Sequence, residues 1–182
     1  IIKTSPIVSG NETIYPAAQI IFNDIILDKV HFFAGPLGDF ALAKNLRTPL
    51  YNFAVVIDDF EMKISHVIRG EDHIANTAKH ILIQEALGFD RPQYAHMPMI
   101  LAEDRSKLSK RHGAVGLMEY RNMGYLPEAL VNFLVLLGWS PQDSNREILT
   151  KNEVIEQFSL EKVHKSGAVF DVKKLNWLNS QY

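Results

Sequence analysis

The stretch that decides the fold is residues 62–88, which read MKISHVIRGEDHIANTAKHILIQEALG. Its first part alternates apolar and polar side chains as far as Arg69, which predicts a strand that is buried on at least one face. Gly70 ends this strand, and Asp72 is a suitable N-cap for a helix whose apolar residues recur at intervals of three, four and seven. Gly88 stands where such a helix stops. A strand, a glycine and a helix in this order form half of a βαβ unit.

The residues on either side extend this unit. Residues 94–101 predict the next strand, so residues 62–101 together predict a parallel crossover and an α/β fold. Upstream, prolines and glycines separate short β-prone runs at 19–27 and 39–44, which predicts a small, irregular, strand-rich segment.

Downstream of residue 113 the pattern becomes helical. Pro127 suits a first helical turn, and the apolar run 128–137 that follows it predicts a helix that is buried on most sides and stops at Gly138. Thr150 and Glu153 form a capping box, and Asp171 can cap a last helix. We place the boundary between the α/β and all-α regions near Gly113.

The composition excludes several classes of protein. The chain has 182 residues, of which 47% are apolar and 22% charged, as in ordinary globular domains. No apolar run approaches the about 18 residues that span a bilayer, so we expect no membrane segment. The chain has no cysteine, which rules out disulfides, thiolate nucleophiles and cysteine zinc sites. Because the net charge is −2, any contact with phosphates must come from a local cluster of basic residues.

One such cluster is the loop Lys107-Leu108-Ser109-Lys110-Arg111. Two lysines spaced three apart, with a hydroxyl between them, can bind the oxygens of a polyphosphate. By itself a short basic loop is more often a solvated surface. The phosphate-loop, dinucleotide, serine-elbow and H-E-x-x-H motifs are absent from the sequence.

The pentapeptide resembles the Lys-Met-Ser-Lys-Ser signature of class I aminoacyl-tRNA synthetases, in the Lys-Leu-Ser-Lys-Arg form typical of glutamyl-tRNA synthetases. The resemblance runs in order from about Phe22 to Tyr182. It rests on five further blocks: Tyr51–Asp59, His66–His73, His96–Pro98, Gly124–Leu130 and Phe170–Asp171.

This resemblance implies a domain organisation. Residues 51–113 would be the second half of a class I, Rossmann-like parallel-sheet catalytic domain, and 114–182 an all-α region that contacts the tRNA stem. Residues 1–50 would be the end of the family's inserted acceptor-binding region. None of the seven histidines lies in a His-x-Gly-His motif, and the chain begins at Ile1. We therefore expect an internal piece of a longer protein, with the first half of the catalytic site and the anticodon-binding domains outside it.

The resemblance also implies a function. The parent protein would be a ligase that activates glutamate with ATP and transfers it to the acceptor end of tRNA. Lys110, helped by Lys107, would compensate the charge on the leaving pyrophosphate, and Mg²⁺ would accompany the ATP. We expect a cytoplasmic, monomeric parent protein, and we expect the isolated fragment to be inactive.

The glutamate-binding residues implied by the resemblance are Arg69 and Tyr51. Arg69 falls at the carboxyl end of the predicted strand, where its planar fork can hold a carboxylate through two hydrogen bonds. An equally good interpretation from the residues alone is an arginine that pairs with Glu71 or Asp72 at the surface.

The ATP-binding residues implied by the resemblance are Lys107, Ser109, Lys110, Asp72, His73, Met99 and Ile100. Asp72 and His73 fall where the family holds the adenosine end of ATP, and Met99 and Ile100 where it packs the adenine. The alternatives are a helix cap for Asp72 and plain strand core for Met99 and Ile100.

A protein-bound metal is not expected. His73 and His80 lie seven apart on one face of the predicted helix, but no third ligand stands at metal-site spacing, so we predict no zinc. The pair Asp58 and Asp59 is better explained as a solvated turn than as an acid–base pair or a pair of magnesium ligands.

Two other functions stay open. The chain could belong to a glutaminyl-tRNA synthetase or to a shorter glutamylating relative. It could also be a non-catalytic module that binds a tRNA acceptor stem.

Overall fold

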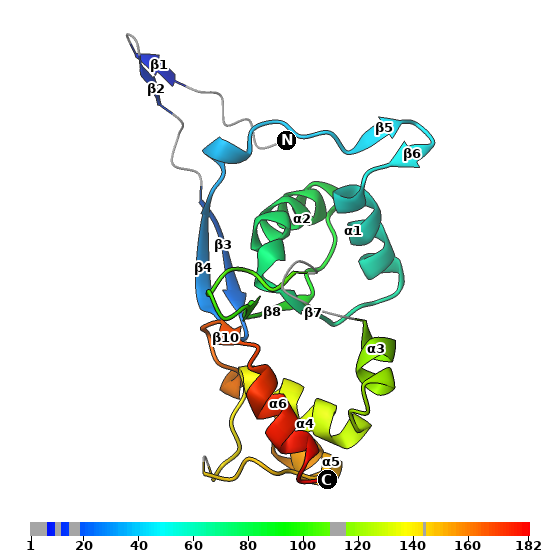
Figure 1. Cartoon of the computed structure of the whole chain (residues 1–182). Helices are drawn as coiled ribbons and strands as arrows, with labels where there is room; N and C mark the ends of the chain where they lie inside the picture. The colour runs from blue at the N-terminus through cyan, green and yellow to red at the C-terminus, as the bar shows by residue number, and fades with distance from the viewer. Residues whose placement is uncertain (1–6, 10–11, 15–18, 110–115, 144) are drawn as a thin grey trace. The chain divides into compact units, whose positions relative to one another are not determined.

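The computed structural model describes residues 7–9, 12–14, 19–109, 116–143 and 145–182. The chain divides into two compact units, Ile1–His96 and Met97–Tyr182 (Figure 1).

The first unit is built on a four-stranded sheet. In spatial order the strands are β4 (Asp28–Phe33), β3 (Gln19–Asp24), β8 (Gln93–Met97) and β7 (His66–Gly70). Strands β3 and β4 form an antiparallel hairpin, while β3 runs parallel to β8. Helix α2 (Ile74–Leu87) connects β7 to β8, and these two strands are hydrogen-bonded neighbours. The α/β fold predicted from residues 62–101 is therefore confirmed.

The junction between β7 and α2 differs from the prediction. A 3₁₀ turn, η2 (Glu71–His73), separates the two elements, so α2 begins at Ile74 with His73 in the N-cap position and no side-chain cap. The prediction that Asp72 caps this helix is therefore wrong. Instead, its carboxylate folds back over Gly70, where an added Cβ would lie 2.6 Å from Asp72 Oδ1. At the other end Gly88 has φ +69°, which confirms the predicted stop.

The predicted strand 94–101 is split in two. Strand β8 ends at Met97, and Ile100–Leu101 form a separate strand, β9, which pairs in parallel with β10 (Ala168–Val169) in the second unit. Pro98 stands at the break, and a proline cannot donate a hydrogen bond to a neighbouring strand. Gly167 lets the two short strands approach, because a Cβ there would lie 2.8 Å from the Met99 carbonyl oxygen.

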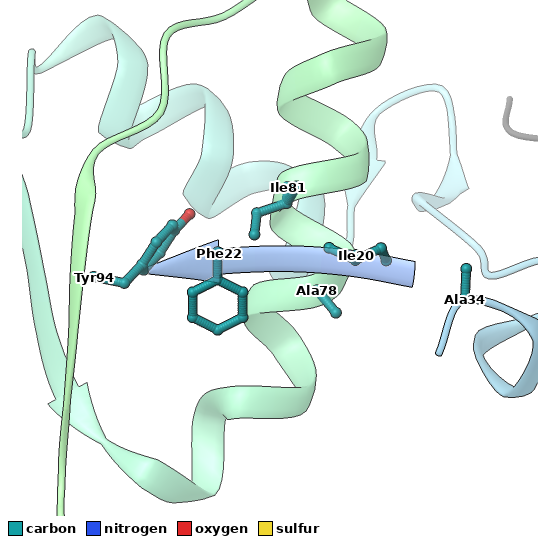
Figure 2. Close-up of a cluster of buried hydrophobic side chains, with 6 residues drawn as sticks. All are labelled: Ile20, Phe22, Ala34, Ala78, Ile81 and Tyr94. Carbon is teal, nitrogen blue, oxygen red and sulfur yellow. The ribbon is translucent and has the colours of Figure 1, made fainter. Parts of the chain in front are cut away.

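The upstream hairpin supplies half of the sheet, with β3 in its interior and β4 at one edge. Alternate residues of β3 are buried, and Ile20 and Phe22 pack against Ala78 and Ile81 of α2 (Figure 2). The edge of the Tyr94 ring meets Phe22 at a centroid distance of 5.9 Å. The segment expected to be irregular thus contributes directly to the core of the α/β unit.

Helix α1 (Tyr51–Glu61) was not predicted. It packs against α2, and its end is held by the stacked rings of Phe60 and Phe89, 3.7 Å apart. Asp58 and Asp59 lie within this helix, so the predicted turn is wrong. Burial raises the pKa of Asp59, although the nearby Arg69 charge opposes that shift. Two short hairpins complete the described strands of this unit: β1 (Ile7–Ser9) with β2 (Glu12–Ile14), and β5 (Ala43–Asn45) with β6 (Thr48–Pro49).

The second unit is mostly helical, apart from β9 and β10. Its helices are α3 (Leu117–Asn122), α4 (Pro127–Gly138), α5 (Lys151–Gln157) and α6 (Val172–Asn179), with a 3₁₀ turn η4 at Leu160–Lys162. Their core contains Leu130, Phe133, Leu175 and Leu178. No helix in the described ranges is both long enough and apolar enough to cross a membrane.

The predicted caps of the second unit are confirmed. Pro127 is in the first turn of α4. Thr150 accepts a hydrogen bond from the Glu153 amide at 3.3 Å, and Glu153 accepts one from the Thr150 amide at 2.8 Å. Asp171 accepts bonds from the first amides of α6. The expectation that α4 is buried on most sides is only partly met, because Val131 and Leu134 are nearly half exposed.

Candidate substrate-binding site

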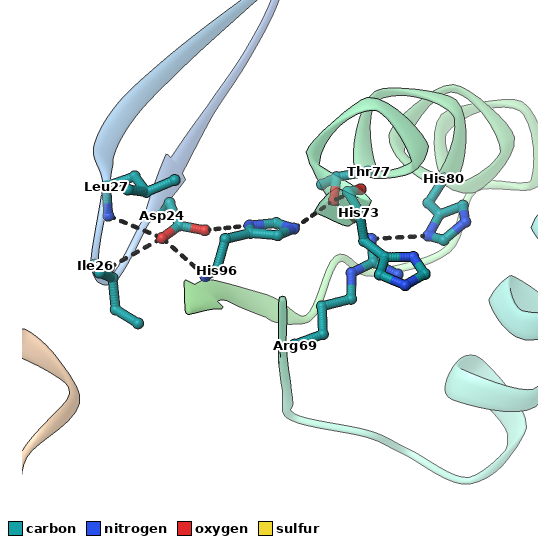
Figure 3. A network of polar contacts seen from close by, with 8 residues as sticks. All are labelled: Asp24, Ile26, Leu27, Arg69, His73, Thr77, His80 and His96. Atoms are coloured by element: carbon teal, nitrogen blue, oxygen red, sulfur yellow. Dashed lines mark hydrogen bonds and ion pairs between the residues drawn. The ribbon is translucent and has the colours of Figure 1, made fainter. Parts of the chain in front are cut away.

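Arg69 lies at the carboxyl end of β7, just before the 3₁₀ turn. Its Nη2 donates to Thr77 Oγ1 at 2.6 Å and lies 3.4 Å from His80 Nδ1 (Figure 3). Its Nη1 reaches the Tyr51 hydroxyl at 3.5 Å. The guanidinium is also 5.9 Å from the centre of the Tyr94 ring. These contacts orient the guanidinium. None of the contacting side chains carries a negative charge that would neutralise it.

The Arg69 guanidinium keeps hydrogen-bonding capacity for a ligand. A guanidinium carries five N–H groups. The two on Nη2 face Thr77 and His80, whereas Nε is buried and has no hydrogen-bond partner among the described residues. Buried donors are nearly always paired in folded proteins, so this Nε–H suits a group that arrives with a substrate.

His80 is a neutral acceptor for Arg69. The His80 ring is buried between Arg69 and Asn52, whose Oδ1 is 3.0 Å from His80 Nε2. Burial, followed by the positive charge of Arg69, lowers the pKa of His80 from 6.5 to about 4. A neutral ring with its proton on Nε2 donates to Asn52 and accepts from Arg69 through Nδ1, which satisfies both contacts.

Behind Arg69 lies a buried row of polar side chains from three elements (Figure 3). Asp24 Oδ2 at the end of β3 is 2.6 Å from His96 Nδ1 in β8, and His96 Nε2 is 2.9 Å from Thr77 Oγ1 in α2. Asp24 Oδ1 accepts the backbone amides of Ile26, Leu27 and His96. Exposed fractions are 4% for Asp24 and 0% for both Thr77 and His96. Burial lowers the pKa of His96, and this outweighs the opposite effect of the Asp24 hydrogen bond, so we take the ring as neutral.

The structure brings together three residues that the sequence singled out for the substrate: Tyr51, Arg69 and His73. Tyr51 is the first residue of α1, with half of its surface exposed, and its ring lies 6.3 Å from His73 and 5.9 Å from His80. Sequence reasoning missed Asp24, Thr77 and His96 as members of this site. Only His96 carried a signal, as the first residue of a block that matches the synthetases.

The remaining candidates in the second unit lie along β9. Leu101 forms an antiparallel bridge with Lys107, and the Leu108 amide donates to the Ile100 carbonyl at 3.0 Å, so Lys107–Ser109 fold back along this strand. Ile100 is 39% exposed and Met99 is half-buried, so the alternative of plain strand core is wrong for Ile100. Lys110 and Arg111 lie outside the described residues.

Within the described ranges, no three histidine or acidic side chains gather closely enough to hold a metal ion. Asp72 is exposed in the 3₁₀ turn, and His73 Nδ1 is 3.1 Å from Asn76 Nδ2. Around Arg69 the structure thus places three neutral hydrogen-bond partners, Tyr51, Thr77 and His80.

Acid is expected to destabilise the first unit through His80. Unfolded His80 takes up a proton near pH 6.5 but folded His80 only near pH 4, so lowering the pH through this window favours the unfolded state. The free energy of unfolding should fall by up to about 1.4 kcal/mol per pH unit. Urea unfolding of wild type and His80→Gln between pH 4 and pH 7.5 measures this.

His80→Gln cannot take up that proton, so its stability should fall less steeply, while carboxylate protonation affects both proteins alike. His164→Gln, at an exposed position, is the matched control and should keep the wild-type slope. Equal slopes for wild type and His80→Gln would contradict the prediction.

Comparisons with family models, curated proteins and solved structures agree on one family. The family model "tRNA synthetases class I (E and Q), catalytic domain" matches residues 13–177. The chain is 55% identical, over 163 residues, to the glutamate–tRNA ligases of Desulforamulus reducens and Aquifex aeolicus, covering 90% of this chain and 34% of each ligase. The crystal structure of a glutamate-tRNA synthetase from Elizabethkingia anophelis has a TM-score of 0.83 at 43% identity, covering 93% of this chain and 38% of that one. The chain therefore spans about a third of the length of these relatives.

Proposed function

Because the chain belongs to the catalytic-domain family of class I tRNA synthetases for glutamate and glutamine, we propose that it is the second half of the catalytic domain of a glutamate–tRNA ligase. The observation that carries this proposal is the 53–56% identity, over about nine-tenths of the chain, to relatives that are all named glutamate–tRNA ligases. Such a ligase joins glutamate to tRNA in two steps. The glutamate α-carboxylate attacks the α-phosphorus of ATP and pyrophosphate leaves. A ribose hydroxyl of the tRNA then attacks the acyl carbon and AMP leaves.

Arg69 is proposed to bind the side-chain carboxylate of glutamate. The α-carboxylate is the nucleophile of the first step, and pairing it with a guanidinium would weaken its attack. The side-chain carboxylate needs an anchor and takes no part in bond formation. The unpaired Nε–H of Arg69 and the exposed Tyr51 hydroxyl beside it support this role. A carboxylate accepts such hydrogen bonds at all its lone pairs, whereas the amide of glutamine would also present donors to the arginine.

The basic loop is proposed to bind the phosphates of ATP. The first step needs no protein nucleophile, but it does need the reactants aligned and the charge on the departing pyrophosphate compensated. Lys110 and Lys107 would supply that compensation, with Ser109 as an additional donor. Met99 and Ile100 would pack the adenine, and Asp72 and His73 would hold the adenosine end. Mg²⁺ would enter as part of the ATP complex, since polyphosphate oxygens are its preferred ligands.

The proposal also assigns each of three stretches of the chain to a region of the parent protein. Residues 1–50 would end the acceptor-binding region, 51–113 would be the second half of the catalytic domain, and 114–182 would contact the tRNA stem. The parent protein would be a cytoplasmic monomer that takes glutamate, ATP and tRNA as substrates.

The test is glutamate-dependent ATP–pyrophosphate exchange by the full-length protein, with and without tRNA, against a panel of amino acids. We expect turnover with glutamate and less than about 1% of that rate with glutamine, because a site built for one polar group strongly rejects an analogue that cannot pair with it. Preference for glutamine would favour the glutaminyl enzyme. Salt-dependent tRNA binding without exchange would favour the binding module. The isolated chain of residues 1–182 should show no exchange.

A further inference from the structure

The buried row Asp24–His96–Thr77 ends on Arg69, and its distances and charges favour one direction of hydrogen-bond donation. His96 is neutral and its Nδ1 faces a carboxylate at 2.6 Å, so Nδ1 carries the ring proton and Nε2 is an acceptor. The Thr77 hydroxyl lies 2.9 Å from Nε2 and 3.3 Å from the His73 carbonyl oxygen, so it donates to the nearer acceptor, His96, and accepts from Arg69 Nη2 at 2.6 Å. Donation runs from Arg69 through Thr77 and His96 to Asp24 (Figure 3).

A hydroxyl, an imidazole and a carboxylate in this order also form the nucleophilic triad of many hydrolases. That role does not fit here. Thr77 is 0% exposed, and its oxygen already accepts a 2.6 Å hydrogen bond from a cation, which lowers its nucleophilicity. The arrangement instead resembles the buried hydrogen-bonding groups that lie behind a ligand-binding side chain and fix its orientation.

We propose that Thr77, His96 and Asp24 are positioning residues that hold the Arg69 guanidinium in the orientation that binds the side-chain carboxylate of the amino-acid substrate. The proposal rests on the function proposed above. The 2.6 Å bond to Thr77 is much the shortest of the three side-chain hydrogen bonds of Arg69, since those to His80 and Tyr51 are 3.4 and 3.5 Å. Removing Thr77 would leave a buried N–H of Arg69 unpaired and let a long side chain leave its binding orientation.

The same row couples the upstream hairpin to the site. Asp24 lies 72 residues before His96 and belongs to β3, outside the βαβ unit that carries Arg69. Its carboxylate is fixed by three backbone amides as well as by the His96 ring. The hairpin β3–β4 thus contributes to glutamate binding without touching the substrate.

The test uses Thr77→Val and Thr77→Ser in the full-length enzyme, with Ser65→Ala, which removes an exposed hydroxyl of the same unit, as the control. Valine keeps the shape of threonine but lacks the hydroxyl, whereas serine keeps the hydroxyl. We expect Thr77→Val to raise KM for glutamate by about 10-fold to 30-fold, the effect of losing one hydrogen bond to a charged group, with KM for ATP changed less than twofold. KM for glutamate should stay within about threefold of the wild-type value in Thr77→Ser and should be unchanged in Ser65→Ala.

A double-mutant cycle with Arg69→Lys separates positioning from general structure. If Thr77 acts through the guanidinium, Thr77→Val should change KM for glutamate much less in the Arg69→Lys background than in wild type. If Thr77→Val does not fold, Thr77→Ala takes its place in the cycle, and circular dichroism melting monitors folding.

Each remaining result decides between the two proposals. An unchanged KM for glutamate in folded Thr77→Val, or an equal rise in KM for glutamate and ATP, would overturn the positioning role while the ligase function stands. The positioning role would also be overturned if the effects of Thr77→Val and Arg69→Lys on KM for glutamate were independent, so that Thr77→Val raised KM by the same factor in both backgrounds. Absence of glutamate-dependent exchange in the wild-type protein would instead refute the proposed function.

Discussion

Replacing Arg69 by alanine in the full-length protein is expected to lower kcat/KM for glutamate in ATP–pyrophosphate exchange by about 10²–10³. The change removes the cation that would pair with the substrate carboxylate, and the loss of one partner of a desolvated, hydrogen-bonded charge pair costs about 2–5 kcal/mol. Arg69→Lys should also be impaired, because an ammonium cannot reproduce the two-pronged contact or the bond to Thr77. KM for ATP should change little.

The matched control for Arg69→Ala is Arg91→Ala. Arg91 belongs to the same unit, but it is exposed and forms an ion pair with Glu85. It should retain wild-type exchange kinetics. If folded Arg69→Ala keeps more than a third of the wild-type kcat/KM for glutamate, Arg69 does not bind this substrate.

Lys110→Ala in the full-length protein is expected to lower the rate of glutamate activation by about 10²–10³, the range for removing one preorganised group that stabilises developing charge. Since the charge develops on the departing pyrophosphate, the loss should appear in kcat for exchange, with KM for glutamate nearly unchanged. Single-turnover formation of the adenylate measures the step directly.

Arg91→Ala, which also removes an exposed cation, is again the control and should leave the activation rate unchanged. A loss smaller than threefold in a folded Lys110→Ala protein would defeat the assignment of the basic loop. Together the two variants separate the roles, because Arg69→Ala should affect the response to glutamate and Lys110→Ala the chemical step.

Features that depend on neighbouring residues could be predicted from the sequence. The capping box at Thr150 and Glu153, the cap at Asp171 and the left-handed Gly88 were all placed correctly. In each of these, both partners lie within a few residues, so local geometry alone decides the contact. Asp72 was the exception, because a 3₁₀ turn inserted before α2 moved the N-cap position to His73.

Helix α1 shows where a local pattern was present but overlooked. Phe53, Val56, Ile57 and Phe60 recur at helical spacing, yet the acidic pair Asp58–Asp59 was interpreted as a turn. On a helix, neighbouring residues point in different directions, so Asp58 is exposed while Asp59 is partly buried and the helix still presents an apolar face.

By itself, the sequence determined the strand that carries Arg69, the helix that follows it, the basic loop and the family resemblance, because these are properties of contiguous residues. Only the tertiary structure decided that β3 pairs with β8, and so that Asp24 meets His96 and completes the buried row behind Arg69. The physical reason is that a strand's partner depends on which surfaces the whole unit buries together, and no spacing along the chain encodes a hydrogen bond between residues 72 positions apart.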